Sequence, residues 1–298
     1  MPACRFLVAA LGKINKGGRL LKVGVALGGG GVRGLAHISV LEALDQLGLR
    51  PSVMAGTSMG AIIGALYASG ISGQELKERV ERHIILKDDT WQDVIEKRAN
   101  LLKWVNVFSA DFSSKGLLKA QGFFKYLFSE IQENRFEDLE IPLVVIAADY
   151  WTAEEVVFET GDLLPAVQAS MAVPGVFAPV SIAGRVLVDG GVVNLVPYDR
   201  IMDRADLTIA VNVARTRPQN TAEIPNAIES VLGAFDIMQS AALAEKMKYR
   251  KPDIYVRPEI PDVRMLDVGK IEEVFTQTAQ AVEEMKKHLA DRLTELQG

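Results

Sequence analysis

Residues 51–67 read PSVMAGTSMGAIIGALY: an apolar strand-like run, a five-residue turn and a helix-like run of small residues. The turn, Gly56-Thr57-Ser58-Met59-Gly60, matches G-x-S-x-G, the pattern of a serine held on a strained strand-to-helix turn. Such a turn needs neighbours without bulk, which Gly56 and Gly60 provide. We therefore predict that Ser58 is a nucleophile. From this motif alone, a tight turn with a buried structural serine stays open.

A second glycine cluster follows an earlier strand. Residues 23–27, VGVAL, form a continuous apolar run, which predicts a strand covered on both faces. The run enters GGGGVRG at residues 28–34, and apolar residues then recur with helical spacing over residues 35–47. Strand, loop, helix, strand and elbow make a βαβα opening, so we predict an α/β fold with a mostly parallel sheet.

Three interpretations compete for the glycine loop. Gly29, Gly31 and Gly34 satisfy the dinucleotide fingerprint, but the following strand ends without the required acidic residue. A phosphate-binding P-loop needs Gly-Lys-Ser/Thr, whereas this loop ends Arg33-Gly34-Leu35. Consecutive glycines also expose backbone N–H groups, and a helix start adds partial positive charge. Because a candidate nucleophile follows on the next strand, we favour an oxyanion hole.

The three histidines are poor candidates for the base that a serine needs. His37 lies early in the first predicted helix, where we expect it to pack or to cap a local polar group. His83 and His288 lie in charged helical stretches. None follows the serine at a strand end, where a Ser–His–Asp triad of the α/β-hydrolase type places its histidine.

An aspartate is the better candidate. Asp189-Gly190-Gly191 follows the strand-like run at residues 185–188. An acid followed by two glycines suits a carboxylate presented from a turn. A turn aspartate bonded to its own backbone is the alternative for this triplet.

Four blocks resemble those of the patatin-like phospholipase family, most closely its short bacterial type. In chain order, residues 28–34 resemble the family's oxyanion block, residues 56–60 its elbow, residues 169–180 (ASMAVPGVFAPV) its A-S-x-A-x-P block, and residues 189–191 its D-G-G/A block. The resemblance covers about residues 22–215. It implies a three-layer α/β/α sandwich with a mostly parallel central sheet.

The resemblance also implies a Ser–Asp dyad, in which Ser58 attacks an ester carbonyl and Asp189 accepts its proton. A free aspartate has a pKa of about 3.9, so burial must raise its basicity. Arg33 then orders the glycine loop or raises the local positive potential; a solvated residue at the helix start is the alternative. The implied oxyanion donors are the N–H groups of Gly29, Gly30, Gly31 and Met59, and the implied supporting residues are Arg33, Gly56, Gly60, Gly190 and Gly191.

Composition excludes several classes of partner. The net charge is −5 over 298 residues, which gives no basic footprint for nucleic acid. No H-E-x-x-H spacing is present, so we expect neither metal nor other cofactor. The single cysteine, Cys4, fits a reducing compartment. The apolar stretch at residues 5–11 is too short to span a membrane. We expect a soluble cytoplasmic protein, with peripheral membrane contact left open and the oligomeric state undetermined.

We predict three parts: an N-terminal extension (1–21), a patatin-like phospholipase domain (22–215), and a C-terminal strand and helices packed on the same core (216–298). Strands are expected at residues 143–147, 156–158, 186–188, 209–213 and 254–256, with a hairpin around residues 183–185. A helix is expected at residues 163–171, and residues 214–226 read as a loop. The final helix carries an apolar stripe from Ile271 to Leu296, for which we favour packing over dimerisation or membrane contact.

Aromatic residues gather in the helical region 72–140, and Phe108, Phe112, Phe123 and Phe124 suggest a flap over an acyl-chain pocket. The leading hypothesis for function is a serine lipid acyl hydrolase of phospholipase A, lysophospholipase or esterase type, acting on lipid esters. One alternative is a regulatory or binding protein that uses the glycine loop for an anion or nucleotide. Another is an acyltransferase working through the same acyl-enzyme.

Overall fold

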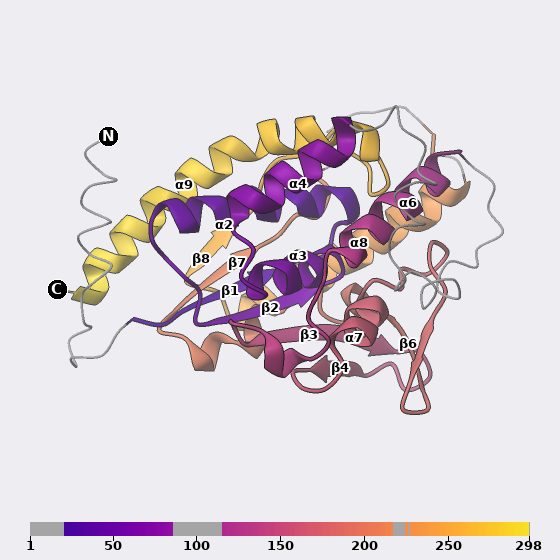
Figure 1. Cartoon of the computed structure of the whole chain (residues 1–298), viewed down its shortest axis with the longest axis horizontal. Coiled ribbons are helices and arrows are strands. Elements are labelled where there is room, and N and C mark those ends of the chain that lie inside the picture. Colours follow the sequence, from indigo (N-terminus) through magenta and orange to yellow (C-terminus); the bar gives the residue numbers. More distant parts are fainter. Residues whose placement is uncertain (1–20, 86–114, 217–223, 226, 298) are drawn as a thin grey trace.

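The computed structural model describes residues 21–85, 115–216, 224–225 and 227–297. Its centre is an eight-stranded sheet in the order β5-β6-β3-β2-β1-β7-β8, with β4 paired to β3 (Figure 1). Strands β3, β2, β1, β7 and β8 are mutually parallel, whereas β4 and β6 run antiparallel to β3. The predicted mostly parallel sheet is therefore confirmed. The strands are β1 (Val23–Leu27), β2 (Val53–Thr57), β3 (Leu143–Asp149), β4 (Glu155–Phe158), β5 (Val180–Ile182), β6 (Arg185–Asp189), β7 (Leu207–Val211) and β8 (Ile254–Val256).

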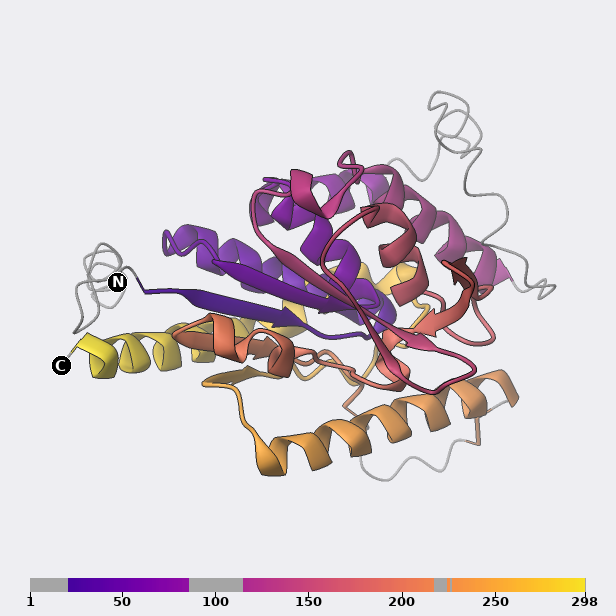
Figure 2. The same cartoon turned by 90° about the horizontal axis from the view of Figure 1, so that it is seen from below.

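Helices cover both faces of the sheet, because successive strand residues point to opposite sides. Val25 and Leu27 of β1 belong to one apolar cluster with α2, α3 and α9, whereas Ala26 belongs to a second cluster that includes Leu243 of α8. Figure 2 shows α8 on the opposite side of the strands from α2 and α3. The three-layer prediction is confirmed. The helices are α2 (Ala36–Gln46), α3 (Met59–Ala68), α4 (Gly73–Ile85), α6 (Lys115–Ser129), α7 (Leu163–Ser170), α8 (Ala227–Tyr249) and α9 (Ile271–Gln297).

The βαβα opening forms as predicted, with one local difference. The predicted helix at residues 35–47 begins as a 3-10 turn, η1 (Gly31–Leu35), and becomes α2 only at Ala36. The Val32 N–H donates to the Met265 carbonyl at 2.9 Å. A segment more than 200 positions away therefore shapes the start of this helix, which no local pattern encodes.

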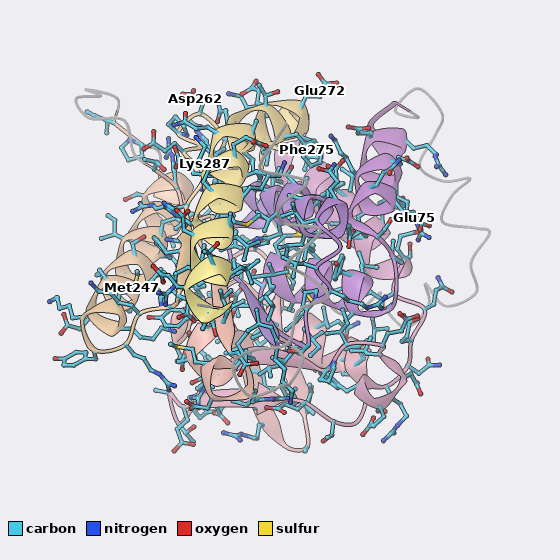
Figure 3. The ribbon with its side chains drawn as sticks, turned by 90° about the vertical axis from the view of Figure 1, so that its left-hand side faces the viewer. Glu75, Met247, Asp262, Glu272, Phe275 and Lys287 are labelled. Atoms are coloured by element: carbon cyan, nitrogen blue, oxygen red, sulfur yellow. The ribbon has the colours of Figure 1, made fainter. Side chains whose placement is uncertain are left out.

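The C-terminal region joins the same sheet and the same core. β8 extends the sheet beside β7, and α9 packs on α2 with Ile271, Val274 and Leu289 buried. Figure 3 shows α9 between α8 and the helices α2 and α4, with Phe275 on the side toward α4. The prediction that the stripe of α9 packs on the core is confirmed. The division of the chain into three parts stays a prediction.

Two strand limits differ from the expected ones. β7 ends at Val211 rather than residue 213, because the Asn212 side chain accepts the Ala214 N–H at 2.9 Å and turns the chain out of the sheet. β6 runs on to Asp189, so the candidate base is the last residue of a strand. The hairpin around residues 183–185 forms between β5 and β6 as predicted.

The flap prediction fails for its two described aromatics. Phe123 and Phe124 on α6 are buried in the main core, and the Phe124 ring stacks edge-on against Phe177 at 5.6 Å. Several residues named from the sequence lie outside the described ones: Cys4, residues 5–11, Phe108, Phe112 and the side chain of His83. In the described ranges, no helix is long and apolar enough to cross a bilayer.

Candidate active site

Ser58 lies on a strained turn between β2 and α3. Its backbone has φ 56° and ψ −124°, a left-handed conformation that non-glycine residues rarely adopt. The turn lies against β1: a Cβ at Gly60 would be 2.0 Å from the Leu27 carbonyl oxygen, and a Cβ at Gly56 would be 2.5 Å from the Gly60 carbonyl oxygen. The serine thus occupies the elbow that the sequence predicts, and the two glycines allow the close approach.

The sheet register brings Asp189 to the same level as Ser58. Thr57, the last residue of β2, pairs with Ile146 of β3, and Asp189 pairs with the next residue, Ala147. Both pairings lie on the same side of β3, because β4 pairs with Ile146 and Ala147 on the opposite side. β6 therefore lies beside β3 directly beyond the end of β2, and no strand separates Ser58 from Asp189. The next residue, Gly190, lies directly against β3: a Cβ at this position would be 2.2 Å from the Ile146 carbonyl oxygen.

The Asp189 carboxyl has the burial and the free oxygen that a base needs. It is 1% exposed, and burial raises its pKa to about 7, although the Ser58 hydroxyl and the Gly191 N–H act in the opposite direction. One oxygen, Oδ1, accepts the Gly191 N–H at 2.7 Å. The other, Oδ2, has no hydrogen-bond partner among the described residues. The Ser58 hydroxyl lies close enough to this carboxyl to lower its pKa, and it also contacts Met171 Sδ at 3.3 Å.

The end of α7 and the residues that follow it hold Ser58 and Asp189 in place. The Ser170 hydroxyl oxygen accepts the Ser58 N–H at 2.8 Å, and the Ala172 carbonyl accepts the Asp189 N–H at 2.9 Å. Ser170 is fully buried. The sequence block at residues 169–180 carried no predicted role, and its match to the A-S-x-A-x-P pattern was the only signal that could have drawn attention to it.

The glycine loop offers fewer free N–H groups than predicted. The Gly29 N–H donates to the Leu195 carbonyl at 3.0 Å, so Gly29 is not a free oxyanion donor, and this part of the prediction is wrong. Gly29 instead passes Ser58, since a Cβ there would be 3.2 Å from the Ser58 Cβ. Within the described part of the chain, the N–H groups of Gly30, Gly31 and Met59 have no acceptor. These three remain the candidate donors.

Gly31 is required by its conformation and by its neighbours. Its φ is +59°, and a Cβ there would lie 2.3 Å from the Met265 carbonyl oxygen. The candidate oxyanion loop is therefore packed directly against the C-terminal segment.

Arg33 is buried, which excludes the solvated alternative. Its side chain is 1% exposed. Its Nε donates to the Val213 carbonyl at 3.1 Å, its Nη1 to the Val263 carbonyl at 3.4 Å, and its Nη2 pairs with Asp236 of α8 at 3.3 Å. Arg33 thus ties the glycine loop to three later segments, in agreement with the predicted ordering role.

A second polar cluster connects the elbow to α8. Thr57 Oγ1 donates to the Asn194 carbonyl at 2.8 Å, and Lys246 Nζ donates to Asn194 Oδ1 at 2.6 Å and to Asp199 Oδ1 at 2.5 Å. Asn194 follows the Asp189 turn by only five positions. Thr57 therefore fixes the chain that leaves the candidate base to the strand that precedes the candidate nucleophile, and Lys246 ties that chain to α8. Sequence reasoning missed this cluster, because no motif names its members.

The described histidines do not serve as a base. His37 Nε2 lies 2.7 Å from the Gly28 carbonyl oxygen, and burial lowers the pKa of His37 to about 4, so the ring is neutral and donates to that carbonyl. Of the two predicted roles of His37, packing or capping a local polar group, the contact with the Gly28 carbonyl corresponds to the second. His288 is exposed on α9. In the ranges that the structure covers, no group of three His, Cys, Asp or Glu side chains is arranged to hold a metal ion.

Comparison with known proteins adds to this geometry. A family model described as patatin-like phospholipase matches residues 25–202. An uncharacterized NTE family protein of Mycobacterium tuberculosis is 33% identical over 76% of this chain and 61% of its own length. Lysophospholipase NTE1 of Saccharomyces cerevisiae is 26% identical over 85% of this chain and 16% of its own. The chain thus spans less than two thirds of these curated relatives.

Among solved structures, VipD from Legionella pneumophila superposes with a TM-score of 0.47 at 14% identity, covering 89% of this chain and 67% of that one.

Proposed function

The chain belongs to the patatin-like phospholipase family, and from this premise we propose that it is a serine lipid acyl hydrolase acting on carboxylic esters of phospholipids, lysophospholipids or related lipids. One observation carries the proposal: the buried Asp189, with an unpartnered oxygen and a pKa near 7, lies beside the strained Ser58. A general base whose pKa lies near neutrality is well matched to proton transfer at neutral pH.

The reaction follows from these positions. Ser58 Oγ attacks the ester carbonyl carbon while Asp189 Oδ2 takes the hydroxyl proton. Negative charge develops on the carbonyl oxygen, and the N–H groups of Gly30, Gly31 and Met59 stabilise it. The C–O bond then breaks, the alcohol leaves with the proton from Asp189, and an acyl-enzyme remains. Water then attacks this ester while Asp189 takes its proton, the acyl–Oγ bond breaks, and Asp189 returns the proton to Ser58 Oγ, which frees the fatty acid and the enzyme.

The relatives support a lipid ester as the substrate class. The yeast relative is named a lysophospholipase, although it shares 26% identity and the match covers 16% of its length. Head group and acyl chain are therefore questions for a substrate panel.

The test is activity-based labelling combined with hydrolysis of lipid esters. A fluorophosphonate probe should label the wild type, and Ser58→Ala should abolish labelling and turnover. Asp189→Asn should lower kcat by roughly a thousandfold or more, because it keeps the shape and removes the base. Added alcohols separate hydrolysis from acyl transfer through the products formed. Hydrolysis retained in Ser58→Ala would contradict the proposal, as would saturable nucleotide binding without any hydrolysis.

A further inference from the structure

The turn between β3 and β4 presents two aromatic side chains to solvent. Trp151 is 77% exposed and Tyr150 58% exposed, and their rings stack edge to face with centroids 4.9 Å apart. Of the described residues, only one other aromatic side chain, Tyr249, is strongly exposed. Large aromatic side chains usually gain by burial, so a paired exposure on one turn calls for a partner.

The turn is built to hold these rings outward. Asp149 Oδ1 accepts the N–H groups of Trp151 at 2.9 Å and Thr152 at 3.1 Å, and its Oδ2 pairs with Arg185 Nε at 2.6 Å. The Asp149 carbonyl accepts the Ala153 N–H at 3.0 Å. Ala153 has φ 57°, a conformation that a non-glycine residue keeps only when its surroundings hold it. The aromatic pair therefore sits on a fixed tip rather than on a loosely tethered loop.

The tip stands at the edge of the sheet where the candidate site lies. β3 passes Asp189 at Ala147 and continues to Asp149, and the Tyr150 N–H still donates to the Val186 carbonyl at 2.9 Å. At about 3.3 Å per residue, Tyr150 and Trp151 stand roughly 10–13 Å beyond the level of Asp189. A surface touching the tip would therefore face the carboxyl ends of β2 and β3, where the candidate site lies.

We propose that the Tyr150–Trp151 tip is the contact by which this protein docks on a lipid surface. The inference rests on the proposed lipid hydrolase function, because the tip would bring the candidate site to a lipid surface that contains the substrate. Trp and Tyr have an apolar body and a polar end, which suits the head-group layer of a membrane. Two such side chains bury about 150–250 Å² each, well below the roughly 800 Å² per partner of a stable protein interface. That area fits a small membrane anchor better than a protein docking site.

The charges around the tip predict which lipids it prefers. Asp149 and Glu154 are acidic, and Arg185 is already paired with both. No surplus of positive charge is left on this turn to attract anionic lipids. Docking should therefore proceed on zwitterionic vesicles and resist salt, because aromatic insertion rather than electrostatic attraction drives it.

The experiment compares the full chain with variants on phosphatidylcholine vesicles. The Tyr150→Ser/Trp151→Ser double variant should lose vesicle affinity by roughly tenfold or more, measured by co-sedimentation at low and high salt. Tyr249→Ser is the matched control, because Tyr249 is also strongly exposed. It is the last residue of α8 and lies shortly before β8, at the amino ends of the parallel strands, whereas the tip follows the carboxyl end of β3. Trp151→Phe should retain binding. Brominated phosphatidylcholine should quench tryptophan fluorescence more in the wild type than in Trp151→Phe.

Two activities separate this inference from the proposed function. The double variant should keep turnover of a water-soluble short-chain ester within about twofold, while its hydrolysis of vesicle lipid falls in proportion to binding. A wild type inactive on both substrates would overturn the hydrolase proposal. The vesicle affinities of the wild type and the double variant would still test the docking proposal. Unchanged vesicle affinity in the double variant, no vesicle binding by the wild type, or binding abolished by salt would each overturn the docking proposal. Unchanged affinity would assign the tip to a protein partner.

Discussion

The backbone N–H of Ser58 donates to the side-chain oxygen of Ser170 at 2.8 Å, across 112 positions of sequence. An N–H in a strained turn cannot join the regular hydrogen bonds of the strand before it or the helix after it, so a side chain from another element supplies the acceptor. The next residues, Met171 and Ala172, contact the Ser58 hydroxyl and the Asp189 N–H. One short segment therefore sets the distance between nucleophile and base.

Ser170→Ala should weaken catalysis more than binding. The change leaves the Ser58 N–H buried without an acceptor, which costs about 1–3 kcal/mol of stability. We expect kcat to fall on the order of ten- to a hundredfold with KM little changed, because the elbow loses its fixed position. Steady-state kinetics and thermal unfolding measure both effects. Ser69→Ala is the control, since Ser69 directly follows α3 and its hydroxyl donates to the Ala65 carbonyl of that helix. Equal kinetics in the two variants would remove Ser170 from the positioning role.

Gly31→Ala should damage the candidate oxyanion loop. The added methyl group would meet the Met265 carbonyl oxygen at 2.3 Å on a backbone with φ +59°. Displacing one oxyanion donor costs about 2.7–4 kcal/mol in the transition state, so kcat should fall roughly a hundred- to a thousandfold. Gly161→Ala is the matched control, because Gly161 has φ +85° and open space around it. It should lose stability through backbone strain and retain activity; full activity in Gly31→Ala would contradict the assignment of the loop.

Removing the Arg33 side chain should loosen the C-terminal region from the glycine loop. Arg33→Met leaves two buried carbonyls and Asp236 without their donor, and breaking such a buried pair costs about 3–5 kcal/mol. Arg33→Lys should not restore stability, because one ammonium cannot reach three acceptors in different directions. Denaturant unfolding of Arg33→Met, Asp236→Asn and the double variant measures the coupling. Additive effects would show that the ion pair carries no coupling.

The raised pKa of Asp189 should appear in both activity and stability. The carboxylate is the active form, so kcat/KM should rise about tenfold per pH unit below pH 7 and level off above it. Stability should move the other way. The folded state holds this proton up to about pH 7 and the unfolded state only to about 3.8, so unfolding free energy falls as pH rises through that window. The change is on the order of 4 kcal/mol, at about 1.4 kcal/mol per pKa unit.

Two variants assign that titration. The free energy of unfolding is measured for the wild type and for Asp189→Asn between pH 4 and 8. The fall with rising pH that Asp189 causes in the wild type should be absent from the variant. His37→Asn should keep the activity limb near pH 7, because the pKa of His37 is lowered to about 4. If the residual activity of Asp189→Asn still rose near pH 7, the titrating group would not be Asp189. The same conclusion would follow if this rise were absent in His37→Asn.

The sequence by itself determined the parts of the site that depend on local chemistry. A positive φ at Ser58, a close approach at Gly60 and a left-handed Gly31 each demand small residues at fixed spacing, and that demand is readable without a structure. The continuous apolar run of β1 and the apolar stripe of α9 are equally local, because a strand covered on both faces is apolar throughout and a helix buries residues with its own period. The mostly parallel three-layer fold followed from these patterns.

Only the tertiary structure decided which hydrogen-bonding groups are already satisfied. Leu195 takes the Gly29 N–H, Ser170 takes that of Ser58, and Arg33 reaches carbonyls 180 and 230 positions away. Partners so distant meet because the strand order places β6, β3 and β2 side by side and packs α8 beneath them. A backbone N–H looks the same in every sequence, and whether it is free for a substrate depends on which carbonyl the folded chain brings to it.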